Sequence, residues 1–99
     1  MERKLDPIPP GEILAEEFLK PLGVSQNRLS RDIDVPVSRI AGIIKGERSI
    51  TADTALRLGK YFETSPEMWL NLQSDYELRK LRSGAWPETE KRIRPLSAA

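Results

Sequence analysis

The segment Ser25–Arg48, SQNRLSRDIDVPVSRIAGIIKGER, decides the fold of this 99-residue chain. Its pattern predicts two short helices separated by a brief break, with basic side chains outside a narrow apolar seam. Ser25 is a typical N-cap for the first helix, and Pro36 disfavours helical backbone at Val35. The second helix then starts near Pro36 and stops at Gly46. Two short helices joined in this way are typical of a DNA-reading helix-turn-helix.

The outward face of the second helix, over residues 36–45, carries small residues with a basic rim. With Ile40 pointing inward and about 100° of rotation per residue, Ile43 and Ile44 also point inward. Small outward residues permit close approach to another surface, and basic side chains suit phosphates. We assign base contacts to Val37, Ser38, Arg39 and Gly42. We assign phosphate contacts, aided by the N-terminus of the first helix, to Ser25, Gln26, Asn27, Lys45 and Arg48.

An ordinary antiparallel helix pair in a small bundle is the alternative interpretation of this segment. The charge distribution favours DNA, although the net charge of the whole chain is only +1. Residues 20–48 carry six basic and three acidic side chains, and so do residues 77–99. A local basic patch is what phosphate contact requires, and overall neutrality does not forbid it.

The chain contains neither cysteine nor histidine. This composition excludes a disulfide framework, a thiolate nucleophile and the usual zinc ligands. Glu16, Glu17 and Asp53 have no histidine or nucleophile beside them, so we interpret them as surface and helix-end acids. We therefore predict no catalytic residue, no metal and no cofactor. No apolar run approaches the roughly 20 residues of a membrane span, and no signal segment is present, so we expect a cytoplasmic protein.

The whole chain predicts an all-α fold of five helices without a strand. Residues 1–9 are rich in proline and predict an extended arm, because each proline pushes its predecessor out of helical backbone. The first helix is expected from Pro10 to a stop at Pro21. The other four are expected over residues 25–34, 36–45, 51–62 and 65–81. Residues 1–82 then form one domain, and residues 83–99 lack periodicity and predict a mobile tail.

Two tryptophans leave alternatives open. Trp69, Leu72 and Tyr76 share a stripe on the helix over 65–81, which favours a place in the core or in a dimer interface. We assign these three residues to a dimer interface. Trp86 lies in an aperiodic context, where it either anchors a partner or folds back onto the domain.

Five stretches of sequence carry a family resemblance. They are IPPGEIL over 8–14, EFLKPLGVSQ over 17–26, IAGIIKGERSIT over 40–51, ALRL over 55–58 and TSPEMWLNLQ over 64–73, of which the last two are the most specific. Across residues 7–81 the chain resembles HigA-type antitoxins of the lambda-repressor-like (Xre) helix-turn-helix family. The chain departs from the family pattern at Pro9, often histidine, at Asp34, usually the turn glycine, and at Pro36, usually a Ser or Thr cap.

The resemblance implies a lambda-repressor-like domain that binds double-stranded DNA as a homodimer at a palindromic operator and represses its own promoter. It also implies a protein partner, a HigB-like toxin of the RelE-like, mRNA-cleaving kind, which the chain would neutralise. It implies neither a small-molecule substrate nor a membrane. The alternative within the family is a stand-alone Xre-type regulator without a cognate toxin.

Overall fold

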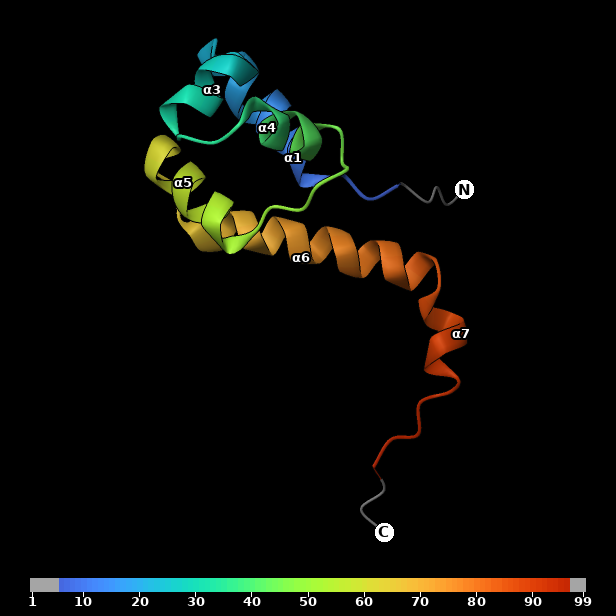
Figure 1. Ribbon diagram of the computed structural model, residues 1–99. Coiled ribbons are helices and arrows are strands. Elements are labelled where there is room, and N and C mark those ends of the chain that lie inside the picture. Colours follow the sequence, from blue (N-terminus) through green and yellow to red (C-terminus); the bar gives the residue numbers. More distant parts are fainter. Residues whose placement is uncertain (1–5, 97–99) are drawn as a thin grey trace.

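The computed structural model describes residues 6–96, which form helices and loops without a strand. Figure 1 shows short helices grouped at the N-terminal end, with the long α6 running out beneath them. The elements are α1 (Pro10–Ile13), the π-helical η1 (Leu14–Leu19), α2 (Lys20–Leu22), α3 (Gln26–Asp32), α4 (Val37–Ile44), α5 (Ala52–Phe62), α6 (Pro66–Ser83) and α7 (Trp86–Glu90). The expected all-α fold is confirmed, and α7 is added to the five predicted helices. Within the same residues no helix has the length and apolar character needed to cross a membrane.

The first predicted helix is present, but it does not end at Pro21. The segments α1, η1 and α2 follow one another without a break. At the end of η1 the N–H of Lys20 donates to the carbonyl of Ala15, five residues back. This shift in bonding lets Pro21, which has no N–H, take an early position in α2. Gly23, with φ at 65°, ends the helix after Leu22.

Three side-chain caps start helices where the sequence predicts them. Ser25, Thr51 and Ser65 each accept a hydrogen bond from the backbone N–H three residues ahead, at 3.0, 3.4 and 3.1 Å. Each bond satisfies one of the backbone donors that a helix N-terminus leaves unpaired. The helices α3, α5 and α6 begin directly after these caps. The predicted starts of these three helices are confirmed. A cap is a bond between residues close in the chain, so the sequence alone can indicate it.

The turn between α3 and α4 is slightly longer than expected. The helix α3 ends at Asp32, and Asp34 takes a left-handed backbone with φ at 59°. A left-handed residue stops a helix, and aspartate tolerates this conformation better than most residues. Pro36 is extended, with φ −63° and ψ 144°, and precedes α4 rather than belonging to it. The two helices of the motif are therefore shorter than 25–34 and 36–45.

Apolar side chains from η1 through the start of α6 form one buried core. Its fully or nearly fully buried members are Leu14, Leu19, Leu29, Ile33, Ile40, Ile43, Ile50, Ala55, Leu58 and Trp69. Trp69 has no exposed surface, and its indole N–H donates to Thr64 Oγ1 at 2.9 Å. The structure corrects the assignment of Trp69 to a dimer interface, because a fully buried side chain has no area to offer a second copy. Its place is the core.

Both ends of the chain were expected to lack helices. Residues 6–9 lie outside any helix, as predicted for the arm, while residues 1–5 of the arm lie outside the described residues. The tail differs, because Trp86–Glu90 form α7. Figure 1 shows α7 at the far end of α6, away from the group of short helices. The tail therefore includes regular structure that sequence periodicity missed, and five residues are too few to establish a helical period.

Candidate nucleic-acid interface

Three of the four predicted base contacts lie on the first turn of α4. Val37 is 42% exposed, Ser38 is exposed and Arg39 is half-buried. No side chain caps this end of α4, because Pro36 occupies the N-cap position. The exposed edge of α4 therefore begins with these three side chains, and each of them has accessible surface.

Gly42, the fourth predicted base contact, does not face outward. It is buried, and a Cβ built on it would lie 2.7 Å from Cδ and 2.8 Å from Cγ of Arg48. The loop after α4 turns back here, since the N–H groups of Glu47 and Arg48 both donate to the Gly42 carbonyl at 2.8 and 3.1 Å. The expectation of an open glycine at a groove floor is wrong for this reason. Gly42 makes room for the stem of Arg48.

The predicted phosphate contacts are all exposed. Ser25, Gln26 and Asn27 form the N-terminal end of α3, where backbone N–H groups favour an anion. Lys45 and Arg48 follow the C-terminal end of α4. We define the candidate DNA surface as the exposed or half-exposed members of the predicted set: Ser25, Gln26, Asn27, Val37, Ser38, Arg39, Lys45 and Arg48.

An ion cluster links the candidate DNA surface to α5. Arg39 Nη1 lies 2.7 Å from Asp53 Oδ2, and Arg57 Nε lies 3.0 Å from the same oxygen. The hydrogen bonds from Arg39 and then Arg57 hold the pKa of the Asp53 carboxyl below its ordinary value of 3.8. Asp53 therefore stays ionised at neutral pH. The sequence identified it only as a helix-end acid.

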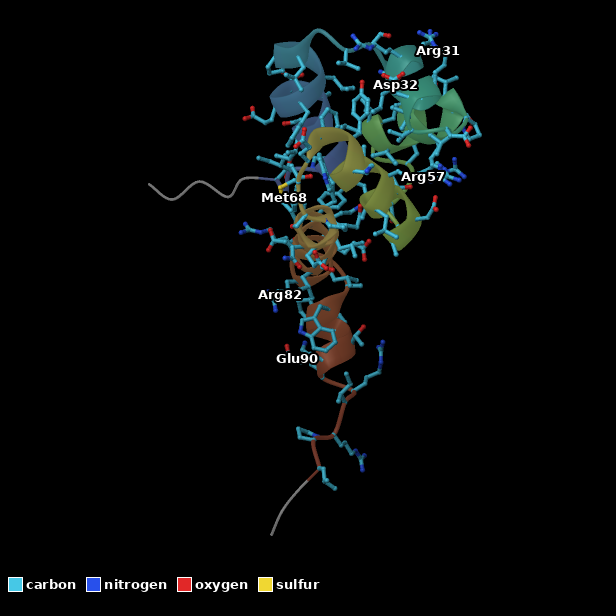
Figure 2. All side chains as sticks on the ribbon, turned by 90° about the vertical axis from the view of Figure 1, so that its left-hand side faces the viewer. Arg31, Asp32, Arg57, Met68, Arg82 and Glu90 are labelled. Atoms are coloured by element: carbon cyan, nitrogen blue, oxygen red, sulfur yellow. The ribbon has the colours of Figure 1, made fainter. Side chains whose placement is uncertain are left out.

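Arg57 also fixes the turn of the motif. Its Nη1 donates to the carbonyls of Ile33 and Asp34, at 2.7 and 3.0 Å. These carbonyls follow α3, where the last groups of a helix lack partners within the helix. In Figure 2 the labelled Arg57 lies with Arg31 and Asp32 at the compact end of the molecule, far from Arg82 and Glu90. The i, i+4 spacing of Asp53 and Arg57 was the one signal of this arrangement in the sequence.

Gly11 sets how closely α4 approaches α1. A Cβ on Gly11 would overlap the carbonyl oxygen of Ile43 and lie 2.6 Å from Cα of Ile44. The backbones of α1 and α4 are therefore in direct contact, which only glycine permits. The position of α4 is therefore limited by its backbone contact with α1, and the turn before α4 is held by the Arg57 bonds.

The other predicted dimer residues, Leu72 and Tyr76, are partly buried on α6. Beyond them the apolar surface becomes more exposed: Leu78 is 47%, Leu81 55% and Trp86 37% exposed. Single exposed apolar residues are common, but these three follow one another along the end of α6 and the start of α7. Among residues 6–96, no group of three or more His, Cys, Asp and Glu is placed to hold a metal ion.

The same helical fold is found in known proteins. The chain matches the helix-turn-helix family (HTH_3) over residues 16–69. An addiction module antidote protein of the HigA family from Coxiella burnetii is 46% identical and superimposes with a TM-score of 0.85, over 93% of this chain and 100% of that one. The chain belongs to the HigA-type antitoxins of the helix-turn-helix family.

Two further relatives are also similar to this chain over most of their own length. The antitoxin HigA of Pseudomonas aeruginosa, solved with the higBA promoter, is 42% identical with a TM-score of 0.85, over 92% of this chain and 99% of that one. Virulence-associated protein I of Dichelobacter nodosus is 47% identical over 79% of this chain and 72% of its own. The likeness to the two HigA structures spans nearly the whole chain, so it includes α6 and residues that follow it.

Proposed function

We propose that this chain is a sequence-specific transcriptional repressor that binds a palindromic operator as a homodimer and acts as the antitoxin of a toxin–antitoxin pair. The observation that carries the proposal is the first turn of α4, where Val37, Ser38 and Arg39 all have accessible surface. The HigA relative solved with promoter DNA supports the same partner. Since that partner is an operator, the proposed site of action is the cytoplasm.

The candidate DNA surface divides into two roles. Val37, Ser38 and Arg39 at the start of α4 reach base edges in the major groove, with Arg39 suited to guanine. The basic ends at Lys45 and Arg48 and the exposed N-terminus of α3 hold phosphates, which sets register without reading sequence. Gly42 has no direct role in this scheme.

The dimer interface is proposed at the exposed apolar end of α6 and α7. Leu78, Leu81 and Trp86 take this role in place of Trp69, and the partly buried Leu72 and Tyr76 lie nearer the start of α6. A twofold dimer presents two copies of α4, so it predicts a palindromic operator. The two half-sites are then expected to lie about one helical turn, roughly 34 Å, apart.

The proposed protein partner is a HigB-like toxin. The surface of α1 and η1 offers apolar and acidic side chains together: the lining of one hollow includes Ile8, Glu12, Glu17 and Phe18. A basic, partly apolar protein surface would suit it. A stand-alone regulator without a toxin is the second candidate, because nothing in the candidate DNA surface depends on a toxin.

Operator binding is tested with the DNA upstream of the chain's own gene in a gel-shift titration. Arg39→Ala is expected to weaken binding by about 1–3 kcal/mol, or about 5- to 150-fold, through loss of a guanine contact. Lys45→Ala is expected to weaken binding to operator and unrelated DNA alike and to flatten the salt dependence. Lys60→Ala removes an exposed cation from α5 outside this surface and is the matched control. Unchanged affinity in both test variants contradicts the DNA surface.

The antitoxin role is tested separately by co-expressing the chain with a small toxin-like protein encoded beside it. Rescue of growth and copurification support a toxin partner. Arg39→Ala should still rescue growth, because Arg39 does not line the hollow of α1 and η1 proposed for the toxin. Failure of the wild-type chain to rescue or copurify contradicts the antitoxin role and favours the stand-alone regulator.

A further inference from the structure

We propose that Asp53 is a positioning residue for base recognition, which holds the guanidinium of Arg39 in the orientation that pairs with guanine. The inference rests on the proposed base contact of Arg39 and extends the recognition machinery to a residue on another helix. Asp53 lies in the first turn of α5, fourteen residues after Arg39 in the chain.

The bond between the two side chains uses one end of the guanidinium. Nη1 of Arg39 donates to Oδ2 of Asp53 at 2.7 Å. Within residues 6–96 the structure gives Arg39 no other side-chain hydrogen bond, so Nε and Nη2 keep their donors. These two nitrogens form the side edge of the guanidinium, with two parallel N–H groups. Guanine presents two acceptors, O6 and N7, at the spacing that such an edge matches.

Asp53 can orient Arg39 because Asp53 is itself held. Its Oδ2 also accepts from Nε of Arg57 at 3.0 Å, and Nη1 of Arg57 donates to the carbonyls of Ile33 and Asp34. The chain of bonds therefore runs from the turn after α3, through α5, to the first turn of α4. A flexible arginine tied to a fixed support loses less freedom on binding a base than one that moves freely.

The exposure of these three side chains indicates which property Asp53 affects, DNA discrimination or protein stability. The side chains of Arg39, Asp53 and Arg57 are 32%, 55% and 36% exposed. Ion pairs with this much contact with water contribute little to folding. When DNA covers the surface, water is excluded and the same pair becomes stronger. The ion pair of Asp53 with Arg39 is therefore expected to contribute far more to DNA discrimination than to the stability of the free protein.

An acid at the start of α5 also favours the helix dipole, and that role alone would not involve Arg39. A merely structural role predicts that losing Asp53 affects all DNA sequences equally. A positioning role predicts that Asp53 and Arg39 act on the same base pair. The loss of one negative charge beside DNA also predicts unchanged or higher affinity for unrelated DNA.

The experiment is competition gel shift with the operator and with versions in which each base pair of a half-site is replaced. Arg39→Ala first identifies the base pair at which discrimination depends on Arg39. Asp53→Ala is expected to reduce discrimination at that same pair by about threefold to tenfold, and Asp53→Asn by less, because the amide oxygen still accepts a hydrogen bond. In the Arg39→Ala background, Asp53→Ala should cause no further loss of discrimination at that base pair.

Glu16→Ala is the matched control, since it breaks an exposed ion pair with Lys20 at 3.0 Å outside the candidate DNA surface. Thermal melting of each variant checks that the fold is retained. Full discrimination in Asp53→Ala at the Arg39-dependent pair overturns the inference, while the base contact of Arg39 stands. Uniform loss at every pair, or an added loss in the Arg39→Ala background, also overturns it. An Arg39→Ala variant with wild-type discrimination overturns both the base contact and the positioning role.

Discussion

The backbone of Gly11 in α1 lies directly against the carbonyl of Ile43 in α4, with no space for a side chain between them. This contact fixes the distance between the first helix and the helix proposed to enter the major groove. Helix separations are usually set by side chains at the contact. Here the separation is set by the absence of one, so the position of α4 depends on a residue that does not itself belong to the candidate DNA surface.

Gly11→Ala is therefore expected to be strongly destabilising. The added methyl overlaps backbone atoms that cannot rotate away, and the cost should reach about 3 kcal/mol. Gly42→Ala is the control, because its methyl meets only the flexible side chain of Arg48. That variant should cost less than about 1 kcal/mol, partly offset by the better helix propensity of alanine. Urea unfolding measures both, and equal costs would contradict the backbone contact.

Gln73 is expected to be needed for stability through one buried hydrogen bond. Its Oε1 accepts the N–H of Ile50 at 2.8 Å, and the side chain is 8% exposed. Gln73→Leu keeps the volume but leaves the Ile50 N–H unpaired in the interior, which should cost about 1–3 kcal/mol. Glu77→Ala removes the outer partner, the exposed carboxylate that accepts from Gln73 Nε2 at 2.7 Å and from Ser49 Oγ at 3.4 Å. In chemical denaturation, Gln73→Leu should have a clearly lower free energy of unfolding than Glu77→Ala. The reverse order would be inconsistent with a buried hydrogen bond from Ile50 to Gln73.

Tyr61 is expected to titrate above its ordinary pKa of 10.0. Its hydroxyl donates to Asp32 Oδ2 at 2.7 Å, and this hydrogen bond is the main reason that its pKa is raised. In a Tyr76→Phe background Tyr61 is the one remaining tyrosine. Phenolate absorbance should then show a midpoint above 10.0, and Asp32→Asn should bring that midpoint back toward 10.0.

The same shift fixes the sign of a stability effect. Because the folded pKa is raised, the hydrogen bond stabilises the fold below pH 10 and is lost as the pH rises through the folded pKa. Tyr61→Phe should therefore be less stable than the wild type at neutral pH, and the two should converge in strongly alkaline solution. A constant difference across this range would exclude titration of Tyr61 as the cause.

The exposed end of α6 is expected to control dimerisation. Leu81→Glu places a charge in the proposed apolar interface and should convert the dimer into a monomer in sedimentation experiments. Operator affinity should fall with it, since each half-site would bind alone. Leu56→Glu is the control, because Leu56 is 61% exposed on α5, outside the proposed interface. A Leu81→Glu chain that stays dimeric would move the interface elsewhere.

Local chemistry explains how much of the fold the sequence predicted. The starts of α3, α5 and α6 follow from Ser25, Thr51 and Ser65, because a cap is a bond between neighbours in the chain. The left-handed Asp34 occupies a position where the family usually has glycine. These features depend on a few adjacent residues, so a single sequence carries them.

The errors share a different cause. Gly42 is buried because the loop after α4 brings the side chain of Arg48 over it. The first helix continues past Pro21 because the N–H of Lys20 forms a π-type hydrogen bond. The burial of Trp69 requires knowing which face of α6 meets the core. Each of these depends on contacts between elements, which periodicity alone does not specify. The link from Arg39 to Arg57 was missed for the same reason.

The burial of Trp69 and the exposure of Trp86 also give the protein two optical reporters. An indole enclosed in the core emits at shorter wavelength than one in contact with water. In a Trp86→Phe chain the emission of Trp69 follows melting of the core, and in a Trp69→Phe chain the emission of Trp86 follows whatever covers α7. Fluorescence could thus record folding and assembly in one protein without an added label.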